Sequence, residues 1–251
     1  MSPGDLAVII PARNEADRIA ATVTAAAMLE GADLILVVDD GSTDGTAAAA
    51  EAAGARVIRH PRNRGKAAAM ETGAQAVQLI ESVATGQSTA GPRHLLFLDA
   101  DLADSAANAG PLAGPIRAGT ADVTIAVFTS RVRKGGFGIV TSTAGAGIER
   151  AIGWRPAQPL NGQRCLTRAA FEAALPLAAG WGIETGMTID LARKGLRITE
   201  VEVPLSHRAT GNDWRSQLHR LHQFADVSRA LVAREPATWR ARKDRARRAP
   251  G

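Results

Sequence analysis

Short apolar runs alternate with alanine-rich segments over the first 60 residues of the chain. Apolar runs at 6–10 and 34–38, and a shorter segment at 56–59, predict strands, while 16–29 and 46–53 predict the helices between them. Alternation at these lengths is typical of βαβ units, in which right-handed crossovers join parallel strands. The pattern therefore predicts an α/β fold with a mostly parallel central sheet and helices on both faces.

Predicted helices and strands continue to about residue 232. Periodicity predicts helices at 67–80, 112–117, 143–152, 168–175, 184–194 and 214–232, and strands at 95–98, 122–128 and 197–203. No internal repeat is visible, and the length suits one large α/β domain, which we expect over residues 1–235. Residues 236–251 are rich in Arg and Ala without a packable face, and we expect a disordered tail there.

The strand predicted at 95–98 ends in two carboxylates, Asp99 and Asp101. Ligands of open α/β sheets bind outside the carboxyl ends of the strands, so both acids are placed to meet one. If the backbone stayed extended through Ala100, the acids would share one side, and Mg²⁺ or Mn²⁺ would relieve their repulsion. The alternative is a helix N-cap formed by Asp101 or Asp104.

The segment 60–66, His-Pro-Arg-Asn-Arg-Gly-Lys, concentrates cations directly before a predicted helix. Helix N-terminal amides, the helix dipole and the side chains of Arg64 or Lys66 could together bind a phosphate. The alternative is a solvated basic loop without a ligand.

Composition and charge narrow the classes of partner. The chain has no Tyr, five Phe and four Trp, which argues against nucleic acid as a partner. Cys165 is the single cysteine, so no intramolecular disulfide is expected, and we expect a cytoplasmic protein without a membrane span. Residues 234–251 hold seven basic and two acidic residues, so their net charge of +5 equals that of the whole chain. We therefore expect this segment to assist peripheral attachment to an anionic membrane, at its inner face.

Four motifs in order resemble the family 2 glycosyltransferases of the GT-A fold. They are VIIPARNE at 8–15, VDDGSTDGT at 38–46, RNRGK at 62–66 and LDAD at 98–101, with weaker similarity at 161–164, 182–184 and 207–208. The resemblance implies a nucleotide-sugar-binding half over 1–102 and an acceptor-binding half over 103–235. It also implies a nucleotide-diphosphate sugar as donor, such as a UDP- or GDP-sugar.

The resemblance assigns roles to particular residues. Asp101 would be a catalytic residue facing the diphosphate and a bound Mg²⁺ or Mn²⁺, with His207 as a second metal ligand. The remaining substrate-binding residues that it implies are Pro11, Arg13, Asn14, Glu15, Asp40, Lys66, Asp99, Asn161, Arg164 and Arg208. A purely structural role for His207 is the alternative.

Two subgroups of the family are similar to this chain. Polyprenyl phosphate glycosyltransferases suggest hexose transfer to a lipid-linked phosphate, which is our first expectation. Glucosyl-3-phosphoglycerate synthases, which resemble the chain in a late His at the metal, suggest retaining transfer to a small soluble acceptor such as 3-phosphoglycerate. Leu102-Ala103 lacks the Gln and Pro that usually follow the acids in the lipid enzymes, which weakens the first expectation. A homodimer is left open.

Glu184 occupies the position where relatives carry an acid near the acceptor. It could act as a general base, bind the acceptor, or merely stabilise the start of a helix. The stereochemistry depends on that choice and stays open. From other classes, we weighed a nucleotidyltransferase and a non-catalytic sugar-nucleotide-binding module. A nucleotidyltransferase should carry a glycine-rich loop after the first strand, which this chain lacks. A non-catalytic module would be expected to lose the acids that this chain retains.

Overall fold

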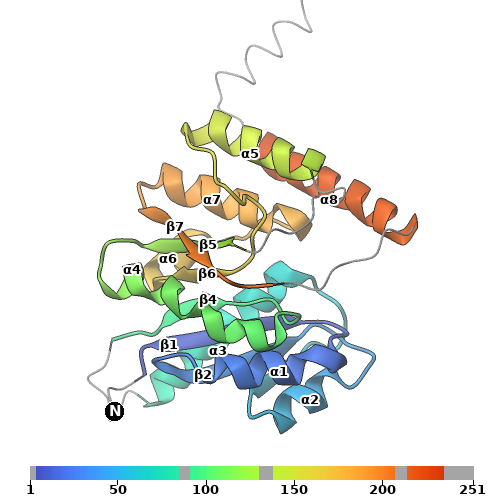
Figure 1. Ribbon diagram of the computed structural model, residues 1–251, viewed down its shortest axis with the longest axis vertical. Helices are drawn as coiled ribbons and strands as arrows, with labels where there is room; N and C mark the ends of the chain where they lie inside the picture. Colours follow the sequence, from blue (N-terminus) through green and yellow to red (C-terminus); the bar gives the residue numbers. More distant parts are fainter. Residues whose placement is uncertain (1–3, 85–90, 130–137, 207–213, 235–251) are drawn as a thin grey trace, which may run out of the picture.

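A seven-stranded sheet runs through the centre of the computed structural model, which describes residues 4–84, 91–129, 138–206 and 214–234 (Figure 1). The strands lie in the order β3-β2-β1-β4-β6-β5-β7. Their bounds are β1 (Leu6–Ala12), β2 (Ala32–Asp39), β3 (Arg56–Arg59), β4 (His94–Phe97), β5 (Val123–Phe128), β6 (Arg164–Leu166) and β7 (Ile198–Val203). Neighbours pair in parallel except at β6, which is antiparallel to β4 and β5. The predicted α/β fold with a mostly parallel sheet is confirmed.

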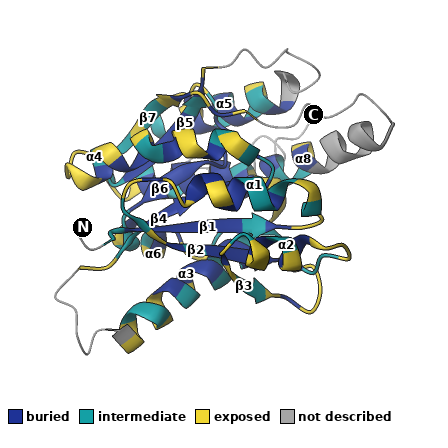
Figure 2. Cartoon of the chain, turned by 60° about the horizontal axis from the view of Figure 1, so that its bottom comes forward, coloured by how far each residue is buried: buried dark blue, intermediate teal, exposed yellow. Residues whose placement is uncertain are grey.

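Helices cover both faces of the sheet, because alternate side chains of each strand point to opposite faces. Leu6, Val8 and Ile10 of β1 belong to one core cluster, and Ala7 and Ile9 belong to the other. The first face carries α1 (Ala16–Ala26), α2 (Thr46–Ala52), the 3-10 segment η1 (Ala103–Ala113) and α4 (Gly114–Arg117). The second carries α3 (Lys66–Ala84), α6 (Arg168–Ala173) and α7 (Ile183–Arg193). Figure 2 shows the strands buried between helices whose outer surfaces are exposed.

A further layer lies outside α7. Here α5 (Gly138–Ile152) and α8 (Trp214–Ala233) pack against each other and against α7, with Val140, Ala144 and Val227 buried between them (Figure 1). The short 3-10 turn η2 (Gly180–Gly182) precedes α7 and contacts α8. Of the helices in the described ranges, none has the length and apolar character needed to cross a membrane.

The strand order reverses direction at β1, which determines where a ligand can bind. From β1 the chain proceeds through α1 to β2 on one side, while β4 pairs with the other side of β1. In open α/β sheets the ligand crevice lies at such a switch point, outside the carboxyl ends of the strands. The segments that follow β1, β2 and β4 meet there, and these segments carry the predicted acids.

The helical region after β4 is longer than predicted. The helix expected at 112–117 is the end of a longer helical region, with η1 from Ala103 and α4 from Gly114. Pro111 lies inside η1, and in a regular α-helix its ring would clash with the carbonyl four residues earlier, which disfavours that geometry. The domain boundary at residue 235 stays a prediction, because the tail lies outside the described residues.

Gly73 allows α3 to lie close to β1, and this contact is testable. A Cβ at Gly73 would lie 2.5 Å from Cγ2 of Ile9. Glycine-to-alanine in a helix ordinarily stabilises by about 1 kcal/mol, whereas overpacking costs about 1–3 kcal/mol. We expect Gly73→Ala to lower the free energy of unfolding in urea by about 1–2 kcal/mol. In an Ile9→Ala background the same change should no longer destabilise, and an equal loss in both backgrounds would contradict the close contact.

Candidate active site

Three charged side chains from distant parts of the chain meet at the carboxyl edge of the sheet. Lys66 is the first residue of α3, Asp99 follows β4, and Glu184 lies in the first turn of α7. The Nζ atom of Lys66 lies 2.7 Å from Oδ1 of Asp99 and 3.2 Å from Oε1 of Glu184. Glu184 is buried, whereas the side chains of Lys66 and Asp99 are 31% and 28% exposed. We call this group the Lys66–Asp99–Glu184 cluster.

The cluster keeps Lys66 positively charged. Burial alone would lower the pKa of Lys66, but the charges of Asp99 and Glu184 and their hydrogen bonds outweigh burial and hold the pKa above its ordinary value. Lys66 is therefore a cation throughout the neutral range, suited to stabilising an anion and not to accepting a proton.

Gly162 and Gln163, which lie within the similar segment 161–164 but were not predicted as site residues, complete the cluster. The Nε2 of Gln163 donates to Oδ2 of Asp99 at 2.7 Å. A Cβ at Gly162 would lie 2.5 Å from Nζ of Lys66 and 3.3 Å from a carboxylate oxygen of Asp99 and of Glu184. Only glycine allows the backbone to approach the charges this closely. The available sequence signal was their position between the predicted site residues Asn161 and Arg164.

Asn161 and Arg164 flank Gly162 and Gln163, are buried, and make internal hydrogen bonds. The Nδ2 of Asn161 donates to the backbone oxygen of Ala126 at 2.8 Å, and Nε of Arg164 donates to the backbone oxygen of Asn161 at 3.1 Å. Arg164 also donates to Oγ1 of Thr188 at 3.0 Å and is only 1% exposed. Burial lowers the pKa of Arg164 to about 10. Both side chains thus bond to residues of the fold, and their contact with a substrate stays a prediction.

Asp40 organises the basic loop at 60–66. Its Oδ1 accepts hydrogen bonds from Nδ1 of His60 at 2.8 Å and from the backbone N–H of Arg64 at 2.7 Å, and its Oδ2 accepts one from Gly65 N–H at 2.7 Å. Burial would raise the pKa of Asp40, but these donors hold it below its ordinary value. The anion that this loop binds in the structure is thus the carboxylate of Asp40, and phosphate binding there stays a prediction.

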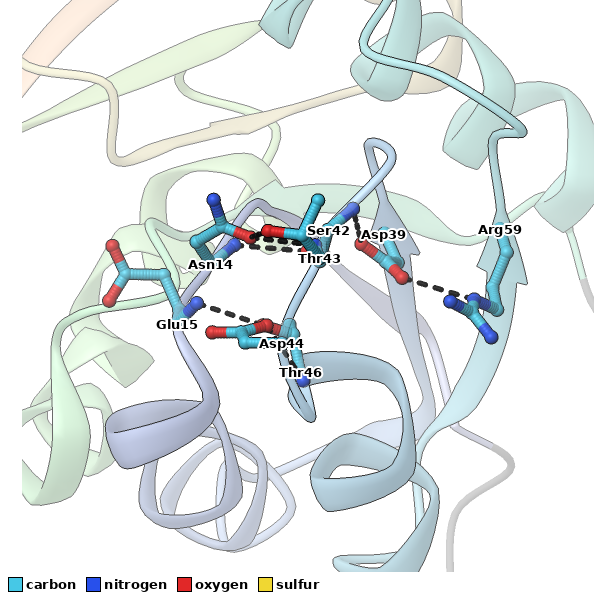
Figure 3. A network of polar contacts seen from close by, with 8 residues as sticks. All are labelled: Asn14, Glu15, Asp39, Ser42, Thr43, Asp44, Thr46 and Arg59. Atoms are coloured by element: carbon cyan, nitrogen blue, oxygen red, sulfur yellow. Dashed lines mark hydrogen bonds and ion pairs between the residues drawn. The ribbon is translucent and has the colours of Figure 1, made fainter.

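Hydrogen bonds join the loops that follow β1 and β2 (Figure 3). Asn14 adopts a left-handed conformation with φ of 56°. Its N–H donates to Oγ of Ser42 at 3.0 Å, its Oδ1 accepts from the N–H of Thr43 at 2.9 Å, and the N–H of Glu15 donates to Oγ1 of Thr46 at 2.9 Å. In Figure 3 the carboxylate of Glu15 points away from these bonds. Nearby, Pro11 is half-buried and Arg13 is exposed.

Asp101 lies in a turn, which changes the geometry expected for the two acids. The extended backbone ends before Ala100, because residues 100 and 101 turn, so Asp99 and Asp101 are not successive positions on one side of a strand. The alternative N-cap role is wrong, since the cap position of η1 is Leu102. Similarly, the cap position of α7 is Gly182, and Glu184 lies inside its first turn, where an acid is favourable for the helix dipole.

The structure also brings the segment after Asp101 to the segment before His207. Oγ of Ser105 lies 3.2 Å from both the backbone N and the backbone O of Ser206, and Nδ2 of Asn108 donates to the backbone oxygen of Pro204 at 3.1 Å. His207 and Arg208 themselves lie outside the described residues. Within the described ranges, no three His, Cys, Asp or Glu side chains gather into a group that could hold a metal ion by itself.

The hydrogen bonds that Asp40 accepts from His60, Arg64 and Gly65, here called the Asp40 clamp, lead to a prediction about stability and pH. Asp40→Asn removes the negative charge and places the amide NH₂ of asparagine against one of the backbone N–H groups of residues 64 and 65. It should therefore lower the free energy of unfolding at pH 7 by about 1–3 kcal/mol. Because the folded-state pKa is depressed, this contribution is present above the unfolded value of about 3.9 and is lost as the pH falls through the folded value. Urea titrations from pH 7 to pH 3 should show the difference shrinking, with the exposed Asp104→Asn as control. A difference independent of pH would contradict the clamp.

Comparison with known proteins gives a consistent result. The family model for glycosyl transferase family 2 matches residues 7–172. Glycosyltransferase AglJ of Haloferax volcanii is 29% identical over 216 residues, which cover 84% of this chain and 66% of AglJ. Glucosyl-3-phosphoglycerate synthase of Mycobacterium tuberculosis is 28% identical over 247 residues, which cover 91% of this chain and 71% of the synthase. The chain thus spans only part of the length of these relatives.

Solved structures agree with the sequence comparisons. The crystal structure of the Mycobacterium tuberculosis synthase in complex with Mn²⁺, uridine-diphosphate and phosphoglyceric acid superposes with a TM-score of 0.68 and 27% identity, covering 91% of this chain and 78% of the synthase chain. The complex of the same synthase with Mg²⁺ and uridine-diphosphate gives a TM-score of 0.69 and 26% identity, with the same coverage of both chains. Because the family model spans most of the sheet and the site, the chain belongs to glycosyl transferase family 2 and has its GT-A fold.

Proposed function

We propose that this chain transfers a hexose from a UDP-sugar to a small phosphate-bearing acceptor, with Mg²⁺ or Mn²⁺ as cofactor. The observation that carries the proposal is the Lys66–Asp99–Glu184 cluster next to Asp101, at the switch point of the sheet. The similar synthase, which was crystallised with Mn²⁺, UDP-glucose and phosphoglyceric acid, supports this combination of ligands.

The donor binds, in this proposal, across the joined loops after β1 and β2. The nucleotide would contact Pro11, Arg13, Asn14, Glu15 and Asp40, while Lys66 and Asp99 lie nearer the sugar and diphosphate. Hydrogen bonds between Asn14 and residues 42–43 hold these loops in place before the nucleotide arrives. Preformed loops lose little conformational entropy on binding, which favours affinity.

The residues present fit a divalent cation. Mg²⁺ is usually held by one or two carboxylates together with substrate phosphates, so Asp101 and a donor diphosphate form a suitable oxygen donor set. His207 would be a further ligand, and the bonds between Ser105 and Ser206 support its approach to the Asp101 segment. When bound, the cation would neutralise the departing nucleoside diphosphate.

The chain's own charges do the remaining work. Lys66, which stays protonated, would attract the donor's diphosphate and is oriented by Asp99 and Glu184. Glu184, the second proposed catalytic residue, would hold Lys66 and face the acceptor. Asn161 and Arg164 would support this acceptor side, with Arg208 contributing from the segment outside the described residues.

We favour a small phosphate-bearing acceptor over polyprenyl phosphate, which was the first expectation from the sequence. The similar synthase has been crystallised with phosphoglyceric acid and with glycerol 3-phosphate. Contact of the basic segment with an anionic membrane stays a prediction, and so does a homodimer. Arg234, the first basic residue of that segment, is paired with Asp190 at 2.5 Å within the fold and is less available to lipid.

Donor binding is testable by thermal shift. UDP with Mn²⁺, at about a hundredfold excess over its Kd, should raise the Tm by about 5–10 °C, because a ligand that binds only the native state stabilises it. Lys66→Met should reduce this shift, while Lys194→Met, an exposed lysine at the far end of α7, should not. If UDP, GDP, CDP and ADP all leave the Tm unchanged with and without metal, the donor assignment fails.

Acceptor choice is testable by measuring release of UDP from UDP-glucose. We expect 3-phosphoglycerate or glycerol 3-phosphate to accelerate release at least about tenfold over water, equivalent to about 1.4 kcal/mol of activation free energy. Polyprenyl phosphate in vesicles should not accelerate it. Acceleration by the lipid alone would restore the lipid acceptor, and the proposal for a small acceptor would then be wrong.

A further inference from the structure

The turn that carries Asp101 contains a strained residue. Ala103 has a φ of 47°, in the left-handed region that residues with a Cβ rarely adopt. Such a conformation costs free energy and persists only where surrounding contacts enforce it, as at binding and catalytic sites. The contacts that hold this turn therefore indicate what determines the position of Asp101.

A single buried hydroxyl joins the two ends of this turn. Thr22 of α1 is fully buried, and its Oγ1 donates to the backbone oxygen of Ala100 at 2.8 Å. The same Oγ1 accepts a hydrogen bond from the backbone N–H of Ala103 at 2.8 Å. The backbone oxygen of Arg18, one helical turn earlier, is farther from the hydroxyl at 3.2 Å. The Thr22 hydroxyl thus bridges the residue before Asp101 and the strained residue after it.

A second side chain of α1 holds the residue between these ends. Nη1 of Arg18 donates to the backbone oxygen of Asp101 at 3.3 Å. Thr22 and Arg18 are four residues apart and so lie on the same face of α1, which packs against η1. Together they contact the backbone of three of the four residues 100–103. These bonds fix the backbone that carries the Asp101 side chain.

We propose that Thr22, assisted by Arg18, is a positioning residue that fixes Asp101 for the divalent cation. This inference rests on the proposed function. Thr22 is too deeply buried to touch a donor or a metal, so it acts through the backbone of the turn. Without the hydroxyl, Ala100 C=O and Ala103 N–H lose their partner in a buried place, and the strained φ loses its support. The turn then relaxes and the carboxylate moves.

The expected effect follows from how strictly Mg²⁺ and similar ions require ligand geometry. Groups that orient a metal ligand without touching the ion typically contribute about 10–100-fold in metal affinity. Thr22→Val keeps the shape of the side chain and removes only the hydroxyl. It should therefore weaken the metal-dependent part of UDP binding and leave the metal-independent part unchanged.

The experiment measures the Kd of UDP by calorimetry with and without Mn²⁺, using the full chain. In the natural sequence Mn²⁺ should tighten UDP binding, and in Thr22→Val this tightening should fall by about tenfold or more. Thr22→Ser, which retains the hydroxyl, should recover most of it. Thr24→Val is the matched control, because its hydroxyl also bonds back along α1, to Ala20 at 2.9 Å, but faces solvent.

Three outcomes would overturn the inference. One is full tightening by Mn²⁺ in Thr22→Val, and another is an equal loss of affinity with and without metal, which is expected of a merely structural role. If Thr22→Val does not fold, Arg18→Met provides the second test, since it removes a partly exposed donor to Asp101 and should also reduce the tightening by Mn²⁺. Unchanged tightening there would equally refute the inference.

The same data separate this inference from the proposed function. If the natural chain does not bind UDP under either condition, the proposed function is wrong and the inference falls with it. If the natural chain binds UDP more tightly with Mn²⁺ but the variants behave like it, only the role of Thr22 and Arg18 is wrong.

Discussion

The ammonium of Lys66 holds together parts of the chain that the sheet alone leaves separate. It bonds Asp99 beyond β4 and Glu184 in α7, which is 118 positions away in sequence. Partly buried carboxylates without a partner would be costly, so α3, β4 and α7 are constrained to bring these charges together. The site therefore depends on the ammonium of Lys66, which Asp99 and Glu184 keep protonated. Gly162 leaves room for this ammonium because it has no Cβ.

The loops of the site are fixed largely by side chains that hydrogen-bond to backbone atoms. Asp40 holds the start of α3 through Arg64 and Gly65, Asn14 holds the loop after β2, and Thr22 holds the turn after β4. Each of them uses short polar groups to satisfy backbone atoms where regular structure ends. A ligand thus meets loops whose conformations are already determined.

The sequence predicted the parts of this arrangement that depend on local patterns. Strand and helix alternation located nearly every element, and the acids after β4 were found because they interrupt an apolar run. It predicted no strand at the position of β6 and could not show that β6 runs antiparallel, because three residues carry neither a periodic nor a directional signal. Nor could it show that Asn161 and Arg164 are buried, since burial of a polar residue depends on contacts distant in sequence. The sequence predicted a phosphate at the basic loop, whereas in the structure the N–H groups of Arg64 and Gly65 bond the carboxylate of Asp40, and phosphate binding there stays a prediction.

The bonds between Ser105 and Ser206 have a consequence for how the protein forms during synthesis. They span 101 positions, so the segment after Asp101 gains this support only when β7 has been made and has docked. Contacts of such long sequence separation form late and slow folding. A nascent chain that has completed β1 to β4 therefore possesses Thr22, Lys66 and the acids after β4, but it lacks Glu184 and Ser206. Binding competence arrives close to the end of translation of the domain, when its last strand joins the sheet.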